Sequence, residues 1–187
     1  MRKMAKKPDT PPASPSPEQG TLCPIARAQD IVGDRWTTLV LRELFLGTRR
    51  FEEIQAHTQA TPQMLTIRLK KLEADGMVER RPYNERPLRH EYHLTDMGQA
   101  FYPVFLALRA WGETWCKAED EEVAIHYTHV PCGHDPGLGP ACQHCGGAMH
   151  REDLRAKLSG SFVAERHARL HAFKGGPPAK PPRGACG

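Results

Sequence analysis

Apolar residues between positions 21 and 76 recur at spacings of three and four, the period of helices that bury one face. The first predicted helix starts at Pro24, because the first turn of a helix has no use for the N–H that proline lacks, and it ends at Gly33. The second follows Asp34, whose carboxylate suits an N-cap, and ends at Gly47. Two adjacent helices are therefore expected at the start of the folded region.

The same period continues through two further predicted helices. A short one contains Phe51 and Ile54, and the next begins at Thr61 and Pro62 and ends at Gly76. The inward face of this fourth helix consists of leucines spaced four and three residues apart. They are Leu65, Leu69 and Leu72.

The period then changes to the alternation that is typical of strands. Residues 77–83 and 89–95 are predicted to form a β-hairpin with a loose tip at 84–88. From Thr95 the helical period returns, and Pro103 should bend this last helix. Its apolar residues are spaced as in helices that pack against another helix, so we expect them to form a dimer interface. They are Phe101, Val104, Leu108, Trp111 and Trp115.

Composition divides the chain into four parts. The proline-rich ends, 1–20 and 174–187, hold too few apolar residues to offset the entropy of ordering and are expected to be disordered. Residues 21–119 carry the predicted helices and hairpin. Residues 120–173 form an extension that contains Gly, Pro, Cys and His, with one or two short helices expected at 151–173.

The order of four helices, a hairpin and a long helix is that of a winged helix-turn-helix domain followed by a dimerisation helix. The predicted fold class is therefore mainly α with a small β-hairpin wing, followed by the Cys/His extension. A formal net charge of +4 over 187 residues is too small to indicate nucleic acid by itself. Within residues 68–89, however, seven Lys and Arg accompany four acidic residues, a local surplus of three.

The fourth predicted helix has an outer face suited to reading DNA. With the leucines inward, this face combines hydrogen-bonding groups, one apolar contact and cations, as major-groove recognition requires. The predicted base contacts are Gln63, Thr66, Ile67 and Lys70. The predicted contacts to phosphates or to the minor groove are Arg49, Arg50, Arg68, Lys71, Arg86 and Arg89. Charge alone would fit a solvated surface equally well, and the order of the elements is what favours DNA.

Four short motifs occur in order between residues 23 and 115. They are Cys-Pro at the first helix, Gly-Asp-Arg-Trp before the second, Arg-Arg-Phe before the third, and Glu-Tyr-x-Leu-Thr at the end of the hairpin. With these motifs, about half of the chain resembles the HxlR-type winged helix-turn-helix transcriptional regulators, which are MarR-like dimeric proteins. The resemblance implies a homodimer that binds an inverted-repeat operator in double-stranded DNA, with the fourth helix as reader and the hairpin as wing.

Cys23 matches the N-terminal cysteine that some members of this family use to sense oxidants or electrophiles. The positive end of a helix favours the thiolate, so a redox-sensing role is chemically available at this position. The alternative is a buried residue that only packs, since free cysteine is among the most buried residue types.

The extension contains candidate metal ligands. Cys142 and Cys145 form a Cys-x2-Cys pair followed by glycines, Cys132 supplies a third thiolate, and His134 is the predicted fourth ligand. The competing histidines are His129, His144 and His150. A closed set of this kind is typical of structural zinc, and a metal would supply the stability that packing cannot provide in so loop-rich a segment. The alternative is a thiol-containing loop without metal.

The sequence also excludes several classes of protein. No apolar run reaches the roughly 18 residues that a membrane span requires, so no membrane association is expected. The basic first residues are not followed by the apolar stretch of a secretory signal, so we expect a cytoplasmic protein with reduced thiols. Gly-rich phosphate loops, Gly-x-Ser-x-Gly and His-Glu-x-x-His are all absent, and an enzyme is not expected.

The predicted function is that of a homodimeric regulator that binds DNA in a sequence-specific way and needs no cofactor to do so. Two alternatives stay open. One is a redox- or metal-responsive sensor that uses Cys23 or the site at Cys132, Cys142 and Cys145. The other is a protein-interaction module that no longer binds DNA. The sequence predicts neither the operator nor an effector.

Overall fold

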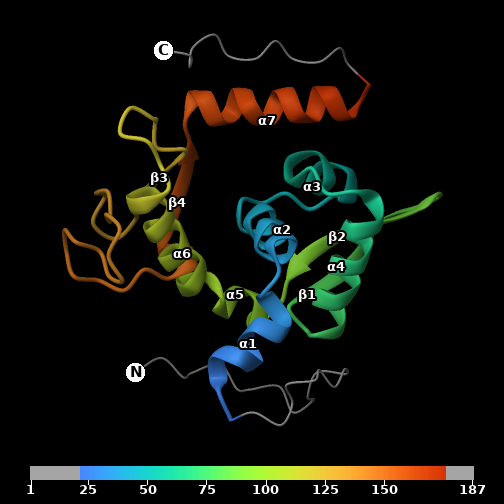
Figure 1. Ribbon diagram of the computed structural model, residues 1–187, viewed down its shortest axis with the longest axis horizontal. Helices are drawn as coiled ribbons and strands as arrows, with labels where there is room; N and C mark the ends of the chain where they lie inside the picture. Colours follow the sequence, from blue (N-terminus) through green and yellow to red (C-terminus); the bar gives the residue numbers. More distant parts are fainter. Residues whose placement is uncertain (1–21, 176–187) are drawn as a thin grey trace.

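The computed structural model describes residues 22–175 (Figure 1). The disorder expected for residues 1–20, and for 174–187 beyond its first two residues, lies outside this range. Lys174 itself is described and forms the C-cap of the last helix.

The first four helices follow the sequence prediction closely. Asp34 is the N-cap of the second helix, and its carboxylate accepts hydrogen bonds from the amides of Trp36 and Thr37. The hydroxyl of Thr61 accepts one from the amide of Met64 at the start of the fourth. Each cap satisfies amide groups that have no partner inside the helix. The helices are α1 (Pro24–Val32), α2 (Arg35–Phe45), α3 (Phe51–Thr58) and α4 (Pro62–Ala74).

The wing is a two-stranded antiparallel sheet of β1 (Val78–Glu85) and β2 (Leu88–Leu94), which begins with Val78 opposite Leu94. Its strands run closer to the tip than predicted. A register shift between Pro82 and Asn84 lets the ladder continue to Glu85, although the side chains there are exposed. The loop at 84–88 was predicted from the Asn and Pro in this short connector, but main-chain pairing requires only free amide and carbonyl groups and continues to Glu85 and Leu88.

The bend expected at Pro103 is a complete break between two helices. α5 (Asp96–Ala100) ends at Phe101, and α6 (Tyr102–Trp115) starts directly after it. Pro103 lies in the first turn of α6, where its missing N–H leaves no carbonyl without a donor. The proline therefore starts a helix and does not interrupt one.

The extension contains strands that the sequence pattern did not predict. β3 (Ile125–His129) pairs antiparallel with β4 (Leu154–Leu158), and the expected short helices at 151–173 are a single turn, Arg151–Asp153, and one long helix, α7 (Gly160–Phe173). The two strands are far apart in sequence, so neither has the nearby partner that makes a hairpin recognisable.

One hydrophobic core joins the extension to the winged domain. It runs from α2 and α4 through the base of the wing and the start of α6 to the β3–β4 hairpin. The rings of Phe45 and Tyr102 lie 4.9 Å apart in it, and Ile125, Tyr127 and Leu154 belong to the same cluster. The guanidinium of Arg151 also donates to the carbonyl of Phe45 over 2.8 Å. The hairpin is therefore packed against the winged domain.

Candidate nucleic-acid interface and candidate metal centre

The outer face of α4 is uncovered within residues 22–175. Its three leucines are buried in the core, as predicted. The residues predicted to contact bases are all exposed on the opposite side, and the apolar one, Ile67, is 47% exposed. They are Gln63, Thr66, Ile67 and Lys70. An isolated apolar side chain among polar ones on a solvent-facing helix suits contact with a thymine methyl group.

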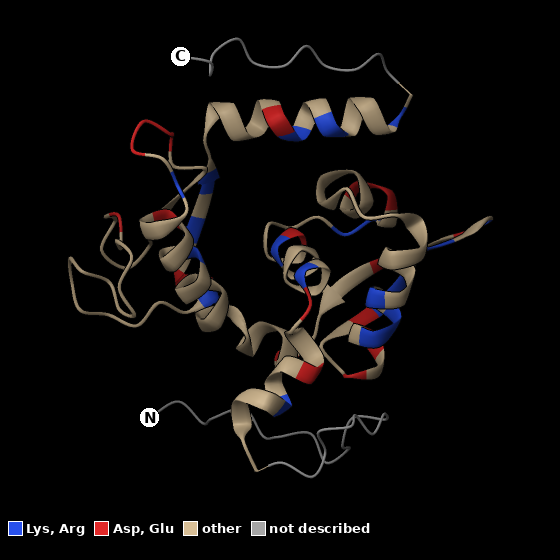
Figure 2. Ribbon diagram, in the orientation of Figure 1, with Lys and Arg blue, Asp and Glu red and all other residues tan. Residues whose placement is uncertain are grey.

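Two of the predicted phosphate contacts lie on the wing. Arg86 is at the tip and Arg89 follows on β2, and both are exposed. The amide of Arg86 donates to the side-chain oxygen of Asn84, which shapes the turn. Lys and Arg lie along α4 and on the wing, with Asp and Glu between them (Figure 2).

Arg49 and Arg50 hold the helix-turn-helix against the wing. The guanidinium of Arg49 donates to the carbonyl of Leu44 over 2.7 Å, and burial, with a smaller contribution from Arg151, lowers its pKa. Arg50 lies 3.5 Å from the carboxylate of Glu91 and over the ring of Tyr83. The main chain of this segment also bridges to β2, so both arginines have a structural role that the sequence did not indicate.

Arg68 and Lys71 also have partners within the chain. Arg68 lies 3.2 Å from the carboxylate of Asp34, the N-cap of α2, and Lys71 pairs with the buried carboxylate of Asp75 over 2.8 Å. Side chains with partners of this kind are less available to phosphates than those at the wing tip. The structure thus divides the ten predicted contacts between an uncovered set and a set with internal partners.

The predicted dimer stripe is the second uncovered surface. α6 buries one apolar face, with Tyr102, Phe105 and Leu106, in the core. The other apolar face is exposed, and Trp111 and Trp115 are 58% and 74% accessible. Phe101 is half-buried at the junction with α5. The exposed members of the stripe are Val104, Leu108, Trp111 and Trp115.

Four side chains of the extension bring their ligand atoms together. His129, Cys132, Cys142 and Cys145 offer atoms that all lie within 4.8 Å of one another. The Nδ1 atom of His129 is 3.3 Å from the sulfur of Cys132 and 3.4 Å from that of Cys145, and the sulfurs of Cys132 and Cys142 are 3.8 Å apart. Zinc bonds of about 2.0–2.3 Å in a tetrahedron require ligand atoms about 3.3–3.8 Å apart. The cluster could therefore hold one metal ion.

The local backbone is built around these sulfurs. Burial alone would raise the pKa of Cys142, but the amides of Cys145 and His144 hydrogen-bond to its sulfur and lower that pKa to about 7. The Cα of Gly147 faces the cluster, because a Cβ there would lie 3.1 Å from the His129 ring and 3.3 Å from the sulfur of Cys145. Amide groups that point at thiolates and a glycine beside them are typical features of metal knuckles.

The fourth member of this cluster is His129, whereas the sequence favoured His134. Strand alternation places Ile125, Tyr127 and His129 on the buried side of β3. His134 is exposed, its ring stacks on His144 at 3.5 Å, and these two form a second group with Cys132. His150 is exposed and belongs to neither group. The alternating pattern of residues 125–129 was the signal that could have identified His129.

Cys23 lies where the sequence placed it, at the N-cap of α1, and is exposed. It therefore does not pack in the core of this chain.

The N-capped reading helix, the helix before it and the wing after it define the class of winged helix-turn-helix DNA-binding transcriptional regulators. The chain belongs to the HxlR-like helix-turn-helix family, which it matches over residues 31–120. Its relatives carry the names of transcriptional regulators, which are not enzymes. None of the helices within residues 22–175 has the length and apolar character to span a bilayer.

Three similar proteins extend this comparison. The helix-turn-helix-type transcriptional regulator Mb3122 of Mycobacterium bovis is 38% identical over 75% of this chain and 89% of its own length. The regulator YodB of Bacillus subtilis is 36% identical over 54% of this chain and 91% of its own length. The crystal structure of PA1607 superposes with a TM-score of 0.61 and 31% identity, covering 76% of this chain and 99% of PA1607.

Proposed function

We propose that this protein is a sequence-specific DNA-binding regulator that acts as a homodimer on an inverted-repeat operator. The observation that carries the proposal is the uncovered outer face of α4, where Gln63, Thr66, Ile67 and Lys70 lie opposite three buried leucines. A helix held from behind by its own apolar face can enter the major groove without losing its support.

The lysines and arginines then have two different roles in binding DNA. Arg86 and Arg89 at the wing reach phosphates or the minor groove, where arginine is favoured. Arg50, whose side chain is half-exposed, adds a phosphate contact beside the first helix of the motif. Arg49, Arg68 and Lys71 act mainly by keeping α2, α4 and the wing in position, through their contacts within the chain.

A second copy of the chain covers the exposed face of α6. Leu108, Trp111 and Trp115 continue an apolar surface that water would otherwise wet, and α1 adds Ile25, which is 69% exposed. Burial of large aromatic side chains is a strong driving force for association. In the dimer the two α4 helices should lie about 34 Å apart, one turn of the duplex.

Binding to the promoter beside its own gene tests this proposal. Fluorescence anisotropy with that duplex, over a range of salt, should show tight binding that weakens as salt rises. A protein-interaction module would bind no duplex at any salt concentration. A dimer that ignored every promoter fragment in dilute buffer would refute the DNA-binding role. As a regulator of this kind, the protein would work in the cytoplasm, where the chromosome of its bacterial relatives lies.

For the cluster at His129 we propose zinc, in a structural role. Three thiolates and one imidazole match the ligands that zinc prefers, and a closed site of four protein ligands leaves no open position for chemistry. DNA binding itself requires no cofactor. Elemental analysis of the purified chain should give one zinc per chain, which His129→Ala should lose and His134→Ala should keep. A zinc content that depended on His134 instead would contradict this ligand set.

A sensor is the second candidate function, because Cys23 is exposed and three further thiols lie in one cluster. The promoter binding assay repeated with oxidant, with reductant and with chelator tests it. A change with oxidant that is lost in Cys23→Ser would assign sensing to that residue. Unchanged binding under all three conditions would exclude the sensor.

A further inference from the structure

The last helix packs against α3 of the winged domain. α7 follows the β3–β4 hairpin but crosses over to α3, the first helix of the helix-turn-helix motif (Figure 1). Arg166 is its only buried residue. Apart from Phe162, which is partly buried against the core, α7 adds no side chain to the hydrophobic cluster, so its position depends strongly on particular polar contacts.

Two arginines make those contacts. The guanidinium of Arg166 donates to the carboxylate of Glu43 on α2, with distances of 3.0 and 2.8 Å, and to the hydroxyl of Thr48. Arg169 donates to the carbonyl of His57, at the end of α3, over 2.8 Å. α7 therefore bridges α2, which packs against α4, and α3, which packs against α2.

The partner of Arg166 is a fully buried carboxylate. Burial alone would raise the pKa of Glu43, but hydrogen bonds and charge from Arg166 and Arg42 outweigh that effect and lower it. An ion pair of this kind adds little net stability, yet removal of one partner leaves a buried charge without its full compensation. The pair thus gives α7 one definite position.

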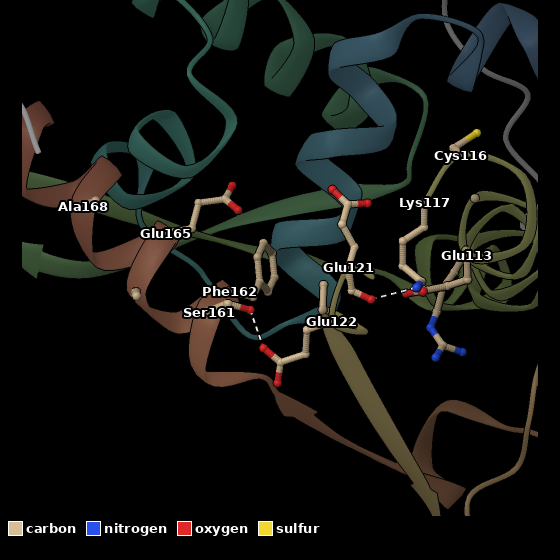
Figure 3. Close-up of a pocket in the computed structure, with 13 residues that line it drawn as sticks. Glu113, Cys116, Lys117, Glu121, Glu122, Ser161, Phe162, Glu165 and Ala168 are labelled. Carbon is tan, nitrogen blue, oxygen red and sulfur yellow. Dashed lines mark hydrogen bonds between the residues drawn. The ribbon is translucent and has the colours of Figure 1, made fainter. Parts of the chain in front are cut away.

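α6 offers α7 no comparable support. A cavity of about 1070 Å³ separates the end of α6 from the first half of α7 (Figure 3). Glu113 and Lys117 line one side of it, and Ser161 and Phe162 line the other. A hydrogen bond from Ser161 to Glu122, in the segment before β3, is drawn beside the cavity. The first half of α7 is therefore positioned by Phe162, which packs against the core, by the bond to Glu122 and by the hairpin that precedes it.

Only one residue separates the end of β4 from the start of α7. β4 ends at Leu158, Ser159 is the N-cap, and α7 begins at Gly160. The amide of Ser159 donates to the carbonyl of Ala124 over 3.0 Å, and its hydroxyl accepts from the amide of Phe162. This junction has no flexible linker, so the direction of α7 follows that of the strands.

The metal cluster lies at the other end of the same hairpin, where β3 ends and β4 begins. His129 is the last residue of β3 and lies opposite Leu154, the first residue of β4. The two ligands Cys142 and Cys145 come from the long loop that joins the strands. Two short strands with such a loop are marginally stable alone, because closing the loop costs entropy. A metal that links His129 to this loop removes much of that cost.

We infer that the metal-bound cluster acts as a latch, which holds α7 across α2 and α3 and so couples metal loading to the DNA-reading head. The inference rests on the zinc proposed above. When the metal leaves, the β3–β4 hairpin loosens, Arg166 separates from Glu43, and α2 and α3 lose the bridge that fixes them behind α4. The reading head then binds DNA less tightly, although no ligand of the metal touches DNA.

Hydrogen–deuterium exchange on the full-length chain tests the latch, with zinc content measured on the same samples. Removal of zinc by chelator should speed amide exchange in α7 and α3 by about tenfold or more and leave the wing strands unchanged. Promoter affinity should fall by about fivefold or more. Zinc that leaves without any change in α7 would overturn the latch but not the zinc site. A chain that never contained metal would overturn both.

The double variant Glu43→Gln with Arg166→Met separates the latch from the metal. It removes both charges of the Arg166–Glu43 pair together, and the glutamine oxygen at position 43 can still accept a hydrogen bond from Arg42, whose side chain also contacts Glu43 in the parent chain. It should keep its zinc and yet show fast exchange in α7, and chelator should then add little further exchange in α3. The matched control Arg155→Met removes an exposed cation from β4 and should behave as the parent chain does. Full additivity of chelator and double variant in α3 would overturn the coupling.

Discussion

The winged domain and the extension are ordered by different means. In the winged domain, α2, α3 and α4 contribute fully buried aliphatic side chains to one core, such as Leu41, Ile54 and Leu65. The extension contributes few buried apolar residues, and its loops converge on three cysteines and a histidine. Packing distributes stability over many contacts, whereas a ligand cluster concentrates it in four atoms. The winged domain should therefore be destabilised by substitutions in its core, and the extension by loss of a metal ligand.

The largest effect is expected from Cys142→Ser. Structural zinc in small domains binds with about 10–16 kcal/mol of apparent free energy, and that energy stabilises the fold around it. The variant should lose its zinc and lose protection from proteolysis within residues 125–158, while the winged domain keeps its helical circular dichroism. Cys116→Ser, which removes an exposed thiol outside the cluster, is the control and should keep one zinc per chain. A Cys142→Ser variant that retained full zinc would show that this cysteine is not a ligand.

Leu69→Ala should destabilise the winged domain and leave the metal cluster intact. Leu69 is buried on the inner face of α4, and its truncation should cost about 2–5 kcal/mol of unfolding free energy, because it leaves a cavity among leucines. Denaturant unfolding measures this loss. Leu88→Ala makes the same chemical change at an exposed position of the wing and should cost little. Equal losses in the two variants would mean that α4 is not held by its packed face.

Trp111→Ala should weaken the dimer without unfolding either region. The ring is exposed within one chain, so its truncation affects association more than folding. An aromatic residue at the centre of an interface contributes about 2–4 kcal/mol on alanine substitution. Analytical ultracentrifugation should show a dimer dissociation constant raised by about 30-fold or more. Thr114→Ala, on an exposed part of the same helix, provides the control. Dimerisation as tight as in the parent chain would place the interface elsewhere.

Gln63→Ala should change recognition alone. If the amide of Gln63 contacts one adenine in two places, its loss should cost about 1–3 kcal/mol and relax the preference at one position of the operator. Binding to a set of single-base operator variants measures this change. Stability and zinc content should stay as they were, since the side chain is exposed. A uniform loss over all operator variants would argue against a base contact.

The smallest effect is expected from Arg86→Ala at the wing tip. A phosphate contact contributes to every sequence alike, so specificity should hold while the slope of log affinity against log salt decreases by about one unit. Titrations at several salt concentrations measure the slope. Glu85→Gln at the neighbouring position is the control for local charge. A loss confined to one operator sequence would contradict the phosphate role.

Local signals in the sequence were sufficient for most of the winged domain. Asp34 and Thr61 cap the helices they were expected to cap, and the three leucines of α4 are buried. Pro103 was read as a bend, although it starts a helix. Capping and helical periodicity are properties of neighbouring residues, so they can be recognised without knowledge of the fold.

Other features were decided by residues distant in sequence. The carbonyl of Arg49 accepts from the amide of Tyr92 on β2, and Arg68 pairs with Asp34 at the N-cap of α2, and no spacing rule connects these residues. β3 finds its strand partner only after the long loop, and that pairing, with the buried side of β3, brings His129 to the cysteines. The bridge from Arg166 to Glu43 joins two residues that are 123 positions apart in the chain.

The amino-acid sequence by itself determined the helices, the wing, the exposed outer face of α4 and the three cysteines of the cluster. Each of these follows from periodicity, capping or short spacing, and such signals act over a few residues. The tertiary structure decided which arginines have partners within the chain, which histidine joins the cysteines and where α7 lies. Those outcomes depend on which surfaces, distant in sequence, pack together. The free energy that favours one packing arrangement comes from all of its contacts together, so no single segment reveals it.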